Sequence, residues 1–201
     1  MMYSPFGLIA KEVGNKVGIA YLRYMSNIDQ LKFPIGPGHH PKELSRLQRA
    51  EHIKTLAELP GLLASVVEPL HDDQLDTVYR PGGWTVRQLV HHMADSHSNA
   101  YIRIRLALTE KHPTIKPYEQ ALWAELPDAS SMPVSVSLNL LNGLHRRLVA
   151  LLRHLSDDQF ERTLDHPEDG IVSIDQMVSA YAWHSLHHLA HITSLIDRND
   201  W

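Results

Sequence analysis

The sequence predicts an all-α protein that folds as a four-helix bundle with one long crossover connection. Apolar residues recur at the three-to-four-residue spacing of a helix along four long segments, which proline and glycine separate. A short motif also recurs: LHDDQL (70–75) and LSDDQF (155–160) each follow a leucine-rich segment and precede a histidine-bearing one. Two helical pairs of similar design pack most simply as a four-helix bundle.

The first helical segment is expected from Leu44 to Leu70, after a loop at 34–40. Pro41 suits the first turn of a helix, because proline lacks only an N–H that has no partner there. Pro60-Gly61 lies within the segment, so we expect the helix to be kinked or divided in two at that point.

The second and fourth helices share a start signal, in which Thr or Ser precedes Gln by three residues. This is the spacing of a capping box, and it occurs at Thr85–Gln88 and Ser173–Gln176. We expect these helices over about 85–108 and 173–197.

A leucine-rich third helix is expected over about 134–155. The connection before it, from Lys111 to Pro133, contains four prolines and is unusually long for a compact domain. Long connections of this kind often carry function, so this one is expected near the mouth of a site.

The composition of the chain limits the kinds of partner that we expect it to bind. With 201 residues the chain is expected to form one domain, and a net charge of −4 favours neither nucleic acid nor a membrane as partner. It has no cysteine, hence no disulfide and no thiolate ligand. The start lacks the pattern of a secretory signal, so we expect a cytoplasmic protein. The expected partner is a small-molecule substrate.

The fourth helix carries four histidines within eight residues, at 184, 187, 188 and 191. At about 100° per residue, His184 and His188 lie nearest the apolar arc of this helix, as an i, i+4 pair. His187 points furthest from that arc, and His191 is intermediate. A metal ion must lie between helices, so the first two are the preferred ligands.

A second histidine cluster lies on the second helix. His91 points away from the apolar face, His92 lies on its flank, and His97 falls within it. Helical phase therefore favours His92 over His91 and leaves His97 open. Facing helices with histidines could supply three nitrogen ligands and leave a position open, as in catalytic metal sites.

Two stretches resemble a known family. YRPGGWTVRQLVHHMADSH (79–97) and WHSLHHLAH (183–191) are closely similar to the YfiT group of DinB-like proteins, which are metal-dependent hydrolases with some bacillithiol S-transferases among their relatives. The similarity runs from about Phe33 to Trp201. It implies a four-helix bundle, a cytoplasmic homodimer, and one divalent metal ion per subunit, zinc first and nickel as the alternative. Carried over residue by residue, the metal ligands are His92, His184 and His188.

The first 24 residues have no counterpart in that family, and Met25 would be a natural beginning. We therefore divide the chain into an N-terminal extension, 1–24, and a DinB-like bundle domain, 25–201.

Beside His92, the side chains of Ser96, Asn99 and Arg103 follow on successive turns within about 40°. They are candidates for substrate binding, with Arg103 able to fix an anionic group. Asp95 could instead orient a ligand imidazole. No residue is assigned as general base.

Three functions are compatible with these residues. The first is a hydrolase, in which the metal lowers the pKa of water. The second is an S-transferase, in which the metal activates a low-molecular-weight thiol. The third is a metal-binding module without turnover.

Overall fold

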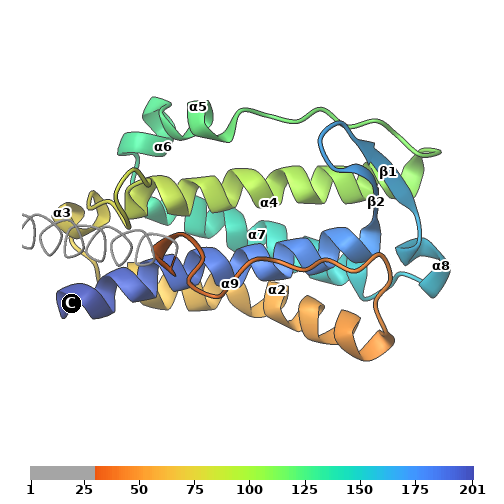
Figure 1. Ribbon diagram of the computed structural model, residues 1–201, viewed down its shortest axis with the longest axis horizontal. Coiled ribbons are helices and arrows are strands. Elements are labelled where there is room, and N and C mark those ends of the chain that lie inside the picture. The colour runs from red at the N-terminus through yellow and green to blue at the C-terminus, as the bar shows by residue number, and fades with distance from the viewer. Residues whose placement is uncertain (1–29) are drawn as a thin grey trace, which may run out of the picture.

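The computed structural model describes residues 30–201, and four long helices form its bundle (Figure 1). They are α2 (Arg46–Val67), α4 (Val86–Thr109), α7 (Val134–Leu152) and α9 (Ile174–Asn199). Both α2 and α4 pack against α7 and α9, so the two long helices from each half of the chain lie diagonally opposite each other. The predicted four-helix bundle is confirmed. The predicted extension, 1–24, lies outside the described residues.

Capping boxes begin three of the long helices. In each, a hydroxyl accepts a hydrogen bond from a backbone N–H, and the Gln side chain accepts one in return; the pairs are Ser45–Gln48, Thr85–Gln88 and Ser173–Gln176. The last two were predicted. The first shows that Pro41 does not begin α2, because Ser45 satisfies the free N–H groups four residues later.

The helix α2 continues through Pro60, so of the two expected effects of Pro60-Gly61, a kink or a division, the division does not occur. Proline at this position cannot donate to the carbonyl of Leu56, one turn earlier. That carbonyl accepts instead from Nδ1 of His145 on α7, at 2.5 Å. A side chain of a neighbouring helix thus satisfies the backbone group that the proline leaves free.

Short elements connect the bundle helices. The repeated motif forms two of them, α3 (Asp72–Leu75) and α8 (Asp157–Phe160), so that α7 ends at Leu152 and not at Leu155. The crossover contains α5 (Gln120–Ala124) and α6 (Pro127–Ser131), which lie along α4.

A β-hairpin precedes α9 and was not predicted. Its strands, β1 (Thr163–His166) and β2 (Gly170–Ser173), are antiparallel, with Thr163 opposite Ser173. Gly170 has a φ of 74°, which glycine adopts at little cost. The run Pro167-Glu168-Asp169-Gly170 was the turn signal in the sequence.

The apolar core consists of two clusters, one toward each end of the bundle. Leu89 and Met93 of α4 belong to one cluster, and Ile104 of the same helix belongs to the other. On α9, Val178 and Ile192 are divided in the same way. His97 of α4 and His184 of α9 therefore lie between the two clusters, whereas His92 lies among residues of the first.

Ion pairs tie the short helices of the repeat to the bundle. In the first half, Arg87 at the start of α4 pairs with Asp72 and Asp76. The equivalent position in α9 is Asp175, so the second half places two acids, Asp157 and Asp175, where the first has an acid and a base.

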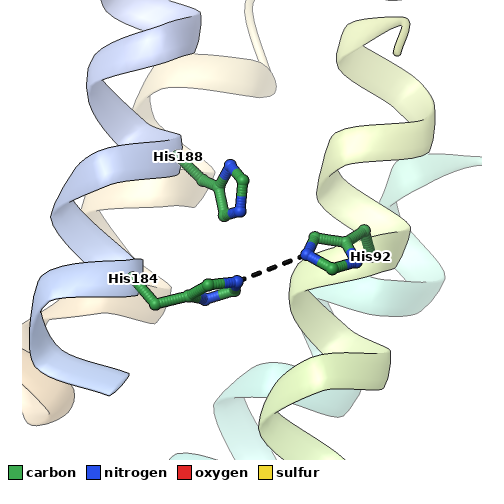
Figure 2. Close-up of side chains that lie close together, drawn as sticks. All are labelled: His92, His184 and His188. Atoms are coloured by element: carbon green, nitrogen blue, oxygen red, sulfur yellow. Dashed lines mark hydrogen bonds between the residues drawn. The ribbon is translucent and has the colours of Figure 1, made fainter. Parts of the chain in front are cut away.

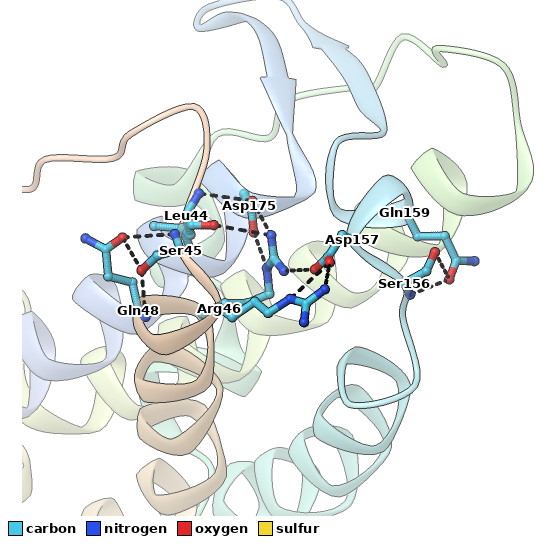
Figure 3. Close-up of polar contacts among 9 residues, drawn as sticks. Leu44, Ser45, Arg46, Gln48, Ser156, Asp157, Gln159 and Asp175 are labelled. Atoms are coloured by element: carbon cyan, nitrogen blue, oxygen red, sulfur yellow. Dashed lines mark hydrogen bonds and ion pairs between the residues drawn. The ribbon is translucent and has the colours of Figure 1, made fainter.

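Arg49 of α2 bridges these two acids. Figure 3 shows the two acids, Asp157 and Asp175, near the start of α2. Its Nε lies 2.7 Å from Oδ1 of Asp175, and its Nη1 lies 2.8 Å from Oδ1 of Asp157. Asp175 is 2% exposed and Arg49 is 9% exposed, so this is a buried pair that joins α2 to α9.

We expect Asp175→Ala to lower the free energy of unfolding by about 3–5 kcal/mol, because it leaves the Arg49 guanidinium buried without its main partner. The control is Glu58→Ala, which removes an exposed pair with Lys54 and should cost less than about 1 kcal/mol. Urea denaturation measures both. Equal losses in the two variants would contradict the structural importance of the buried pair.

Candidate metal centre

Three imidazoles from two helices converge in the middle of the bundle (Figure 2). His92 comes from α4, and His184 and His188 come from successive turns of α9. Their potential ligand nitrogens all lie within 4.8 Å of one another, and the Nε2 atoms of His92 and His184 are 3.3 Å apart. The three residues that were predicted as ligands are thus brought together.

Burial keeps these rings neutral. Desolvation lowers the pKa of His92 to about 4, and it lowers the pKa values of His184 and His188 well below the usual 6.5. Charged neighbours add to the effect, because each protonated ring would repel the others. At neutral pH the imidazoles therefore have a free lone pair, which is the form that binds a metal.

A second histidine group shares one member with the first. His187, His188 and His191 also have potential ligand nitrogens within 4.8 Å of one another, all on α9. Nε2 of His191 is already used, since it lies 3.2 Å from the carbonyl oxygen of Lys32. The ring of His187 is stacked on Trp183 at 4.3 Å. We therefore take the group that spans two helices as the candidate metal centre.

Both His187 and His191 are buried, although helical phase pointed His187 furthest from the apolar arc and placed His191 in an intermediate position. The segment that precedes α2 explains the difference, because it runs along α9 and covers that side of the helix (Figure 1). Phe33 lies against His187, and the backbone of Lys32 accepts from His191. Helical phase indicates the direction in which a side chain points from its helix, but not whether another segment covers that side chain.

His91 is also buried, against expectation. Its ring lies 2.7 Å from Oγ of Ser137 on α7 and 3.1 Å from the carbonyl oxygen of Met132. The helix α4 is covered on this side by α7 and the crossover, so the apolar arc underestimates its buried face. Among the described residues, His91 makes no hydrogen bond to His92 or to α9. It is therefore not part of the group of converging imidazoles.

His97, which phase left open, lies beside the group. It is fully buried, and its Nε2 is 3.2 Å from Nδ1 of His184. Its own Nδ1 is 2.9 Å from Nε2 of His145. Sequence reasoning missed His145, whose only signal was its place among the buried positions of α7.

A cavity of about 380 Å³ opens beside His184. Of the predicted substrate residues, Ser96 and Arg103 line it. Asn99 does not, because its side chain donates to the backbone carbonyl of Asp95 at 2.9 Å. The remaining lining includes residues of the crossover and of the hairpin: Pro117, Tyr118, Gln120, Leu164, His166, Glu168, Asp169 and Val172.

Arg103 is the main cation of this cavity wall. Its Nη1 donates to the hydroxyl of Tyr181 at 3.4 Å, and no carboxylate within 30–201 forms an ion pair with it. Burial raises the pKa of Tyr118 on the same wall to about 12 and also raises that of Tyr181, so both are neutral hydroxyls. The two tyrosines had no signal in the sequence that set them apart.

Asp95 makes no hydrogen bond to a histidine among the described residues, so its predicted role in orienting a ligand is not seen. Burial raises its pKa to about 6, with a smaller contribution from Asp128.

The donor set suits a metal ion. Three imidazole nitrogens are ligands that zinc, nickel and copper accept, and three protein ligands leave room for a further one. The fold and these residues together define a helical bundle with a candidate metal centre between facing helices, a known arrangement in bundle proteins.

The chain belongs to the DinB superfamily, whose sequence profile matches residues 55–192. It is 52% identical over 170 residues to a protein of Oceanobacillus iheyensis named "Putative metal-dependent hydrolase", covering 85% of this chain and 98% of that one. A protein of Bacillus cereus with the same name is 48% identical over 174 residues, covering 87% of this chain and all of that one.

A solved structure has the same fold. YfiT from Bacillus subtilis, described as "a probable metal-dependent hydrolase with an unusual four-helix bundle topology", is 48% identical to this chain and superposes with a TM-score of 0.83. The match covers 86% of this chain and 99% of that structure. The expected relationship to the YfiT group is thereby confirmed. Within 30–201 no helix combines the length and apolar character needed to cross a membrane.

We expect His184→Ala or His188→Ala to abolish most metal binding, while His187→Ala retains it. Each of the first two variants removes one of three ligand nitrogens, and the third removes a ring that stacks on Trp183. Metal content of the purified proteins, measured by mass spectrometry, tests this assignment. Equal metal content in all three variants would refute it.

The metal-free protein should lose stability as the pH falls from about 7 to about 4. Burial lowers the pKa values of His92 and His191 to about 4, whereas unfolded histidine titrates near 6.5. Between these values the unfolded chain binds more protons than the native one, so acid favours unfolding. Each such group contributes up to about 1.4 kcal/mol per pH unit. Denaturation midpoints of chelator-treated protein that stay constant between pH 7 and pH 5 would contradict this expectation.

Proposed function

We propose that this protein is a metal-dependent hydrolase of small anionic substrates, with its metal held by His92, His184 and His188. One observation carries the proposal: three neutral imidazoles converge beside a cavity whose wall contains Arg103. The names of the similar proteins from Oceanobacillus and Bacillus support it.

The metal that we propose is one divalent ion per subunit, zinc first and nickel as the alternative. Nitrogen donors suit both, and the chain has no cysteine to select a softer ion. A divalent ion in such a site supplies Lewis-acid chemistry, lowering the pKa of water and polarising a carbonyl or phosphoryl group. The homodimer and the cytoplasmic location stay predictions from the family resemblance.

The residues of the cavity would bind and orient the substrate. Arg103 offers a guanidinium without a carboxylate partner in the described part of the chain, so an anionic group of the substrate can take that place. The hydroxyls of Ser96, Tyr118 and Tyr181 can donate to further oxygen atoms of the substrate. His184 reaches both the cavity and the imidazole group, so the substrate approaches the centre on its side.

The test is turnover by metal-loaded protein. Esters and amides that carry a carboxylate are offered beside neutral analogues, each with and without a chelator and with and without a low-molecular-weight thiol. A hydrolase gives the product of water addition in all thiol conditions and loses activity with the chelator. Products that contain the thiol would assign the S-transferase function instead, and a lack of turnover in every condition would favour a metal-binding module.

For a carboxylate substrate we expect Arg103→Met to weaken binding roughly ten-fold to a hundred-fold, since a charge-assisted hydrogen bond contributes about 1.5–3 kcal/mol. The metal content should not change. Arg105→Met is the matched control, because Arg105 lies on the same helix but is exposed and bonds to Tyr101. The measurement is KM for charged and neutral substrates. An unchanged KM for the charged substrate would contradict the role given to Arg103.

A further inference from the structure

Each of the two metal-binding candidates on α9 has a second histidine on its far nitrogen. Nδ1 of His184 lies 3.2 Å from Nε2 of His97, and Nδ1 of His188 lies 3.3 Å from Nδ1 of His191. A neutral imidazole has one N–H donor and one acceptor nitrogen, so the proton positions in each chain of rings depend on one another.

In the first series of hydrogen-bonded rings, which runs from His145 through His97 to His184, the position of the proton on His145 is fixed. The carbonyl of Leu56 can only accept, so the proton of His145 must be on Nδ1. Its Nε2 therefore accepts from Nδ1 of His97 at 2.9 Å. Nε2 of His97 must then accept from Nδ1 of His184, at 3.2 Å. His184 is left with an unprotonated Nε2, the atom that faces His92.

Pro60 contributes to this end point. In an uninterrupted helix the backbone N–H at position 60 would donate to the carbonyl of Leu56. Proline has no N–H, which leaves this carbonyl to His145.

The second chain of rings ends on the segment before α2. The carbonyl of Lys32 accepts from Nε2 of His191 at 3.2 Å, so the proton of His191 is on Nε2. Its Nδ1 then accepts from Nδ1 of His188 at 3.3 Å. His188, like His184, is left with an unprotonated Nε2.

We propose that His97, His145 and His191 are positioning residues that hold His184 and His188 in the Nδ1–H tautomer, with both Nε2 atoms ready for a metal ion. The role in metal binding rests on the proposed function, whereas the proton positions follow from the hydrogen bonds alone. Burial supports it, since His97, His145 and His191 are at most 3% exposed.

The tautomers are measured directly on metal-free protein. Two-bond ¹H–¹⁵N correlation spectra of ¹⁵N-labelled protein near pH 8 distinguish the Nδ1–H from the Nε2–H form of each ring, with single variants for assignment. We expect His97, His145, His184 and His188 as Nδ1–H and His191 as Nε2–H. Nε2–H forms of His184 and His188 would overturn the proposal, whatever the variants do.

Affinity for Zn²⁺ alone, measured in competition with a chromophoric chelator, tests the consequence. His97→Phe and His191→Phe remove an acceptor and should weaken binding roughly 10–100-fold, the usual effect of losing a group that orients a metal ligand. His97→Gln and His191→Asn have an amide oxygen that can accept in place of the ring nitrogen, so they should recover much of the affinity.

His91→Phe is the matched control. His91 is likewise a buried histidine of α4 bonded to a backbone carbonyl, but it does not lead to a metal-binding candidate. Its loss should cost stability without weakening Zn²⁺ binding. Equal affinities for His91→Phe and His97→Phe, or no recovery in the amide variants, would contradict a positioning role. If the expected tautomers are found but Zn²⁺ does not bind, the proposed function fails while the assignment of the protons stands.

Discussion

The structure depends on how the bundle provides hydrogen-bond partners for the nitrogen atoms of a group of imidazoles in its interior. A buried polar atom without a partner costs about 1–3 kcal/mol, so each ring nitrogen of this group needs a hydrogen bond or a metal. The rings use one another, and each series ends on a backbone carbonyl, that of Leu56 or Lys32. The Nε2 atoms of His92 and His184 face each other in the middle of the bundle. The arrangement of hydrogen bonds and the candidate metal centre are therefore one feature.

The internal repeat shows how a bundle can be built from two similar halves that are held differently. Both halves use a short capped helix before a long one, but Arg87 pairs with its own half, whereas Asp175 pairs with Arg49 of the other half. The second arrangement links α2 to α9, which lie side by side but are far apart in sequence. The pair thus joins α2 to the helix that contributes both His184 and His188.

Local signals in the sequence predicted the four helices, two capping boxes and the stripe of histidines on α9. They could not predict which faces other segments cover. His187 was expected to point furthest from the apolar arc and His191 to be intermediate, yet the segment at Lys32 and Phe33 covers both, and that contact depends on a long-range packing arrangement. His97 illustrates a second limit: periodicity indicated its direction but not its neighbour His145 on another helix. The sequence could not decide between a kink and a division at Pro60, because the group that bonds to the carbonyl of Leu56 comes from α7.

The candidate metal centre comes from α4 and α9 alone, whereas the cavity is lined by these two helices together with the crossover and the hairpin. The long helices α4 and α9 supply the imidazoles, whereas the crossover and the hairpin supply Tyr118, Leu164 and Val172 to the cavity wall. His184 belongs to both, whereas His188 does not line the cavity and its Nδ1 lies beside Nδ1 of His191. The cavity thus meets the centre from one side only. Changes in the crossover or hairpin would alter what fits the cavity and leave the imidazoles in place, so this bundle can retain one metal chemistry while its substrate changes.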